Sequence, residues 1–65
     1  MKITLNGETV ETASISLAEL LVSFDYQAES VATAINGVFV AITERDQTQL
    51  NENDSVDVIA PMAGG

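Results

Sequence analysis

The chain has 65 residues, which suits one small domain, and 46% of them are hydrophobic, enough for a folded core. Two basic residues, Lys2 and Arg45, face ten acidic ones, and the formal net charge of −8 disfavours nucleic acid and anionic membranes as partners. The sequence lacks histidine and cysteine, and so lacks the usual general base, the thiolate nucleophile and the main zinc ligands. We therefore expect no catalytic residue, no metal site and no bound cofactor. No apolar block has the length of a membrane span or resembles a signal peptide, so we expect a soluble, cytoplasmic protein that is not an enzyme.

The first part of the chain predicts a β-hairpin. Residues 1–6 alternate between apolar and polar, with the odd-numbered residues on the core face of a strand. Asn6 and Gly7 are a strong turn signal, because both central residues of a type I′ turn need a positive φ. Residues 8–12 then return as the second strand, with Val10 pointing inward.

A short amphipathic helix follows the hairpin. Ser16 and Glu19 have the spacing of a capping box, in which the serine hydroxyl accepts from the glutamate N–H and the glutamate carboxylate reaches back. Apolar residues then recur at helical spacing, which predicts about two turns with one face on the core. This face comprises Leu17, Leu20, Leu21 and Phe24.

The second half of the chain predicts another hairpin. Residues 31–36 form the third strand, whose register stays open because both of its faces could be half-buried. Asn36 and Gly37 repeat the turn signal, and residues 38–42 form the fourth strand.

A polar segment leads from that hairpin to the last strand. Residues 43–49 predict a short helical turn, with Thr43 and Asp46 at capping spacing. Residues 51–54 predict a loop, and residues 56–60 form the last strand.

This order of elements predicts an α+β domain with a five-stranded sheet covered on one face by one main helix. The last strand needs neighbours on both sides, so we place it in the middle of the sheet. We expect the folded domain to span residues 1–60 and a flexible tail to span residues 61–65.

The tail carries the main functional signal. Glycine has no Cβ, so Gly64 and Gly65 can enter a narrow active site with the terminal carbonyl open to attack. Pro61 stiffens the exit from the last strand. If the valines of that strand point inward, Ile59 points outward beside Met62 and offers an apolar docking surface to a partner. The residues expected to thread a partner's active site are Pro61, Met62, Ala63 and Gly64.

The chain resembles the ThiS family of thiamine-biosynthesis sulfur carriers, which have the ubiquitin-like β-grasp fold. The resemblance spans the chain and rests on four elements of the sequence. Many members follow the second Asn-Gly turn with Val-Pro-Arg, whereas this chain has Val40, Ala41 and Ile42. Arg45 comes three residues later, and whether it takes that arginine's place stays open. The four elements are the opening residues 1–7, the turn at residues 34–37, Asn53 with Asp54, and the tail at residues 61–65.

The resemblance implies a carrier chemistry at Gly65. A ThiF-like adenylyltransferase would convert its carboxylate to a transient acyl-adenylate with ATP. A sulfur nucleophile, drawn from a donor such as a cysteine-desulfurase system, would then give a thiocarboxylate. By the same resemblance, the thiocarboxylate would donate its sulfur to a ThiG-like thiazole synthase.

Three alternatives remain open from the sequence. A molybdopterin-synthase small subunit shares the fold and the Gly-Gly end, although it is usually longer. A ubiquitin-like modifier would use the same adenylate but transfer the chain to a lysine. A binding module whose tail has no chemical role would need no carboxylate at Gly65.

Overall fold

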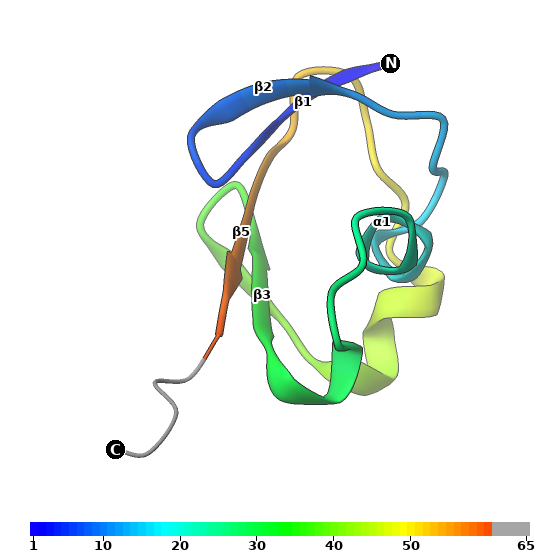
Figure 1. The fold of residues 1–65 in the computed structure, drawn as a ribbon, viewed down its shortest axis with the longest axis vertical. Coiled ribbons are helices and arrows are strands. Elements are labelled where there is room, and N and C mark those ends of the chain that lie inside the picture. The colour runs from blue at the N-terminus through cyan, green and yellow to red at the C-terminus, as the bar shows by residue number, and fades with distance from the viewer. Residues whose placement is uncertain (61–65) are drawn as a thin grey trace.

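The computed structural model describes residues 1–60, in which a mixed β-sheet is covered on one face by a helix (Figure 1). The predicted α+β architecture is confirmed. The helices are α1 (Leu17–Ser23) and two short 3₁₀ helices, η1 (Ala28–Ser30) and η2 (Ile42–Gln47). The strands are β1 (Lys2–Leu5), β2 (Glu8–Glu11), β3 (Ala32–Ile35), β4 (Val38–Val40) and β5 (Ser55–Ile59).

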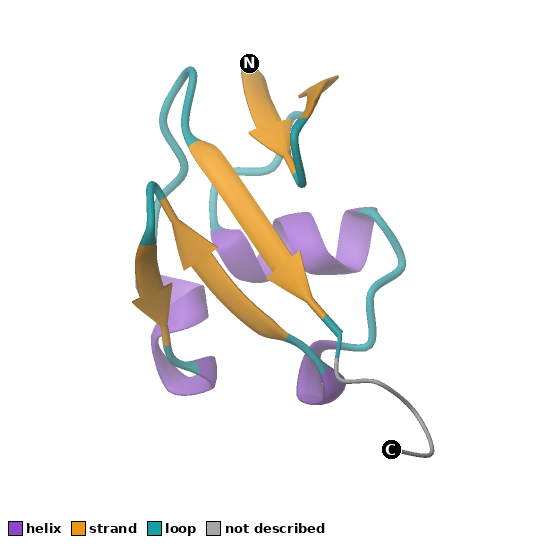
Figure 2. Ribbon diagram, turned by 90° about the vertical axis from the view of Figure 1, so that its left-hand side faces the viewer, coloured by secondary structure: helices purple, strands orange, loops and turns teal. Residues whose placement is uncertain are grey.

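The last strand occupies the middle of the sheet, as predicted. The strands lie in the order β2-β1-β5-β3-β4, with β1 and β5 parallel and the other neighbours antiparallel. Figure 2 shows β5 crossing the sheet with β3 along one side and β1 beside its first half only. β1, at the start of the chain, therefore pairs with β5, the last described strand. This pairing fixes the direction in which β5 leaves the domain.

Both Asn-Gly turns adopt the backbone that the sequence predicts. Asn6 and Gly7 have φ angles of 51° and 85°, and Asn36 and Gly37 have φ angles of 52° and 84°. Positive φ at both central residues matches the right-handed twist of the two flanking strands. Each turn therefore fixes the register of its hairpin without a longer loop.

The helix begins where the capping signal places it. The Ser16 hydroxyl accepts a hydrogen bond from the Glu19 N–H at 3.2 Å, so this half of the predicted box is confirmed. The Glu19 carboxylate accepts from the N–H of Ile15 at 3.0 Å, one residue before the cap. Phe24, predicted in the buried stripe, is the C-cap and is 37% exposed, because the helix ends at Ser23.

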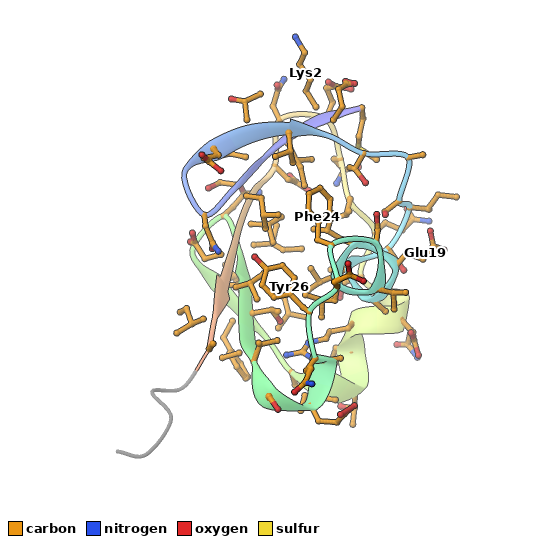
Figure 3. The ribbon with its side chains drawn as sticks, viewed as in Figure 1. Lys2, Glu19, Phe24 and Tyr26 are labelled. Atoms are coloured by element: carbon orange, nitrogen blue, oxygen red, sulfur yellow. The ribbon has the colours of Figure 1, made fainter. Side chains whose placement is uncertain are left out.

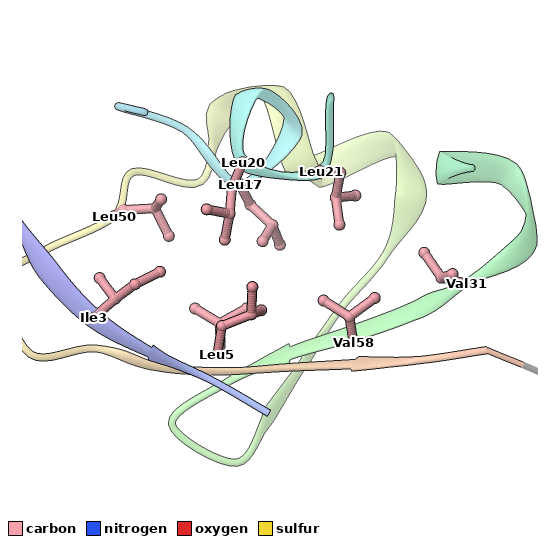
Figure 4. Packing of buried hydrophobic residues seen from close by; sticks show 9 residues of the cluster. Ile3, Leu5, Leu17, Leu20, Leu21, Val31, Leu50 and Val58 are labelled. Carbon is pink, nitrogen blue, oxygen red and sulfur yellow. The ribbon is translucent and has the colours of Figure 1, made fainter. Parts of the chain in front are cut away.

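The core lies between α1 and the inner face of the sheet (Figure 4). Val31 and Thr33 are buried, which resolves the open register of β3 in favour of its odd-numbered residues. Met1 was predicted on the core face but is 36% exposed, because β1 begins only at Lys2. The buried apolar residues are Ile3, Leu5, Leu17, Leu20, Leu21, Val31, Leu50, Val56 and Val58.

The segment after the second hairpin differs from its prediction in two ways. The fourth strand stops at Val40 instead of residue 42, because the chain turns into η2 at Ile42. Thr43 does not cap this helix: the N-cap residue is Ala41, whose side chain makes no capping bond. The predicted loop at residues 51–54 is confirmed, and Asp54 is buried there as the acceptor of the Asn51 N–H at 2.8 Å.

Candidate functional site

The candidate site starts from the end of β5, the strand that leads to the predicted tail. Val56 and Val58 are buried on the core side, so alternation along the strand directs Ile59 to the outer face, where it is 60% exposed. The predicted orientation of Ile59 is therefore confirmed. The tail at residues 61–65, with Pro61, Met62, Ala63, Gly64 and Gly65, lies outside the described residues, and its predicted role stays a prediction.

The side chain of Asn6 secures β5 beyond the point where β1 ends. Its Oδ1 accepts a hydrogen bond from the Val58 N–H at 2.8 Å. This bond replaces the backbone hydrogen bond that β1 would make to Val58 if the strand continued past Leu5. Its Nδ2 donates to the Tyr26 hydroxyl at 3.4 Å, and Figure 3 shows Tyr26 pointing from the segment after α1 toward the sheet. On its other side, β5 pairs with β3 as far as Ile59, opposite Ala32. The domain therefore holds the last described strand from both sides almost to its end.

Ile59 belongs to a small apolar surface on the outer face of the sheet. Phe39 is 68% exposed and lies opposite Ala34, which is two residues along β3 from Ala32, the partner of Ile59. The side chains of Ala32 and Ala34 are small, so they leave the larger side chains of Phe39 and Ile59 exposed to solvent. We call Ile59, Phe39, Ala32 and Ala34 the outer-face patch. Ile59 is the last residue of β5, and residues 61–65 follow it in the sequence after Ala60.

Sequence reasoning missed Phe39. The signal was present in the hairpin: if Val38 and Val40 face the core side, the residue between them must face outward. Phe39 and Ile59 lie on strands that flank β3, so they share one face of the sheet only through the pairing of β3 with β4 and β5. The hairpin of β3 and β4 was predicted from the residues, but the pairing of β3 with β5 was not.

One acidic residue lies beside the outer-face patch. Asp57 lies on the same face, opposite Ala34 and two residues before Ile59. Glu44 and Asp46 are also exposed, but they belong to η2, which packs against α1 on the helix side of the sheet. Figure 3 shows Lys2 projecting from the opposite end of the molecule, far from the end of β5. A protein that docks on this patch would meet the carboxylate of Asp57 beside it.

Arg45 does not present its charge to a partner. It is only 3% exposed, and its guanidinium donates to three neutral acceptors inside the domain. Nε bonds to the Thr33 hydroxyl at 3.1 Å, Nη1 to the Ala28 carbonyl at 2.7 Å and Nη2 to the Val31 carbonyl at 2.6 Å. The question of whether Arg45 replaces a docking arginine is thereby answered: it is a structural residue that ties η2 to η1 and β3.

The helix side of the molecule carries a separate, open depression of about 560 Å³. It is lined by residues of α1 and the preceding loop, including Ala13, Ala18 and Val22, with Asp46 at its border.

Within residues 1–60, no group of three or more Asp and Glu side chains is arranged to hold a metal ion. No helix in this part of the chain is long and apolar enough to cross a membrane.

These features define a ubiquitin-like β-grasp domain: a five-stranded mixed sheet, one covering helix, and a central last strand that leads into the C-terminal segment. The ThiS family model matches residues 3–65, and the chain belongs to the ThiS family.

Solved structures of a relative agree over the whole chain. A crystal structure of the thiamine biosynthesis protein ThiS from Geobacter metallireducens has a TM-score of 0.86 at 29% identity and covers 100% of both chains. A solution structure of a thiamine biosynthesis protein from the same organism has a TM-score of 0.81 at 33% identity, covering 100% of this chain and 88% of the other. An uncharacterised protein, ycf40 of Pyropia yezoensis, is 35% identical over 66 residues, which cover 100% of this chain and 93% of that one.

Proposed function

We propose that this protein is a sulfur carrier in thiamine biosynthesis and that the Gly65 carboxylate is its point of attachment. Membership of the ThiS family, through a match that extends to Gly65, carries the proposal. The fold supports it, because β5 is held in the centre of the sheet and leads directly into the glycine-ended segment. The outer-face patch beside the end of β5 would supply the docking surface.

The chemistry begins with activation of the carboxylate. An oxygen of Gly65 attacks the α-phosphorus of ATP, pyrophosphate leaves, and an acyl-adenylate forms. AMP is a far better leaving group than hydroxide, so the terminal carbonyl becomes open to a sulfur nucleophile. Sulfide displaces AMP directly, whereas a persulfide first forms an acyl disulfide that a second thiol cleaves. Either route leaves the sulfur as a thiocarboxylate on Gly65, which explains how a chain without cysteine can carry sulfur.

The partners would supply the catalytic groups. A ThiF-like adenylyltransferase would bind ATP with Mg²⁺, a cysteine-desulfurase system would provide the sulfur, and a ThiG-like thiazole synthase would receive it. The chain itself would contribute recognition and a reactive end. Its charge of −8 favours partners with a basic rim around the docking site, and such charge complementarity raises association rates.

The experiment that tests this function is the intact mass of the chain after incubation with ATP, a ThiF-like enzyme and a sulfur donor. We expect a mass gain equal to the replacement of one oxygen by sulfur. Sulfur transfer from the purified product to a thiazole synthase or to a molybdopterin synthase then selects the pathway. An unchanged mass, with an enzyme that is active on another carrier, would contradict the proposal.

The docking role of Ile59 gives a separate prediction. Replacing Ile59 with serine should raise the apparent KM of the activating enzyme for the carrier at least about tenfold, because an apolar contact of this size contributes about 1.5–3 kcal/mol when buried. Steady-state adenylation measures this KM. Ile15→Ser is the matched control, because Ile15 is 61% exposed on the helix side and Ile59 is 60% exposed. Equal KM values for the two variants would remove Ile59 from the docking surface.

A further inference from the structure

The two edges of the sheet are built from equivalent hairpins with opposite surface chemistry. Each hairpin has an Asn-Gly turn, and the third residue after the asparagine occupies the same place in both: Thr9 in β2 and Phe39 in β4. The β2 edge carries Glu8 and Glu11, whereas β4 consists of Val38, Phe39 and Val40 and has no charged residue.

The backbone of Phe39 faces the open side of β4. Ile35 and Val38 flank a two-residue turn, and such a pair exchanges two hydrogen bonds across the hairpin. Because hydrogen-bonded and non-hydrogen-bonded pairs alternate, the N–H and C=O of Phe39 point away from β3. β4 is the last strand on this side of the sheet in the described part of the chain, and Figure 2 shows its outer edge uncovered.

Proteins usually protect an edge strand with charge, as β2 does with its glutamates. The β4 edge has no such protection, and Val38 and Phe39 are 67% and 68% exposed. An uncharged strand edge with free backbone groups is a template for the addition of another strand. Phe39 also belongs to the outer-face patch, so an added strand would continue the same surface.

We propose that β4 binds an extended strand of a partner enzyme, which pairs with the backbone of Phe39 and carries lysine or arginine beside the contact. Charge complementarity supports this occupant, because Asp57 lies in the same row of the sheet as Phe39, on the other side of Ala34, and the chain carries a net charge of −8. A second copy fits less well, since it would bring two strongly acidic molecules together. The identity of the partner as an enzyme of the carrier cycle rests on the proposed function.

Two pairs of variants test this proposal. Phe39→Lys is compared with Thr9→Lys, which makes the same change of charge at the equivalent place on the other edge. Chains made by total synthesis with N-methyl-Phe39 or N-methyl-Thr9 then separate backbone pairing from side-chain contact, because the methyl group removes only the outward N–H. Circular dichroism and thermal melting verify that all four chains fold. Adenylation by the ThiF-like enzyme and sulfur transfer to the thiazole synthase are the two readouts.

We expect Phe39→Lys and N-methyl-Phe39 to raise the apparent KM of at least one of these steps about tenfold or more, with both Thr9 variants within about twofold of the wild type. Wild-type KM values for N-methyl-Phe39 in both steps would overturn the β4 proposal and leave the carrier function standing. Failure of the wild-type chain to be adenylated would instead refute the carrier function. A wild-type dimer in analytical ultracentrifugation that N-methyl-Phe39 dissociates would overturn the proposal in favour of pairing between two copies.

Discussion

A chain with one alanine added after Gly65 is expected to form no acyl-adenylate and to gain no sulfur. The extra residue moves the carboxylate by about 3.5 Å along an extended chain, and a misplacement of even 1 Å can cost about a hundredfold in rate. We therefore expect adenylation to fall at least about 10³-fold, together with loss of growth without thiamine in a host that depends on this carrier. Intact mass and pyrophosphate release measure the chemical step.

The Gly65 carboxamide is the sharper form of the same test. It keeps the length of the chain and removes only the nucleophilic oxygen, so docking should survive while the chemistry stops. This chain should act as a competitive inhibitor of wild-type adenylation, with an inhibition constant close to the wild-type KM. Sulfur gain by either altered chain would place the attachment elsewhere and favour a binding module whose tail has no chemical role. Isopeptide-linked adducts of the wild-type chain in cell extracts would favour a protein modifier.

The parts of the fold that the sequence predicted well are those decided by neighbouring residues. Asn-Gly turns need positive φ at both positions, and the Ser16 cap satisfies an N–H three residues away. The central place of β5 followed from a simple requirement for neighbours on both sides. The ends of the elements were predicted less well. β4 ends before residue 42 because the chain turns into η2, and no side-chain cap marks this turn in the sequence.

The rest of the site depends on residues far apart in the sequence. The acceptors of Arg45 lie 12 to 17 residues away, so nothing local distinguishes this buried arginine from an exposed one. Phe39 and Ile59 join one surface only because β4 and β5 both pair with β3. Side-chain alternation could have indicated that each residue faces outward, but it could not indicate that both lie beside the same strand, β3.

The burial of Arg45 leads to the largest expected effect on stability. Arg45→Met should lower the free energy of unfolding by about 3 kcal/mol, because each buried carbonyl left without a donor costs about 1–3 kcal/mol. The buried carbonyl of Val31 and the part-buried carbonyl of Ala28 would both lose their guanidinium donors. A domain of this size has a total stability of about 3–10 kcal/mol, so the variant would be close to unfolding. Urea denaturation followed by circular dichroism measures the change.

Lys2→Met is the matched control, since it also replaces the chain's other basic side chain with methionine and changes the net charge by the same amount. Lys2 is exposed, so its loss should change stability by less than about 0.5 kcal/mol. Arg45→Lys should recover only part of the loss, because one ammonium group cannot reproduce a planar fork directed at three acceptors. If Arg45→Met and Lys2→Met were equally stable, net charge alone would account for both, and the three hydrogen bonds would contribute nothing measurable. A large difference would show that this small domain uses its only arginine to join η1, β3 and η2, where the guanidinium is buried away from any partner.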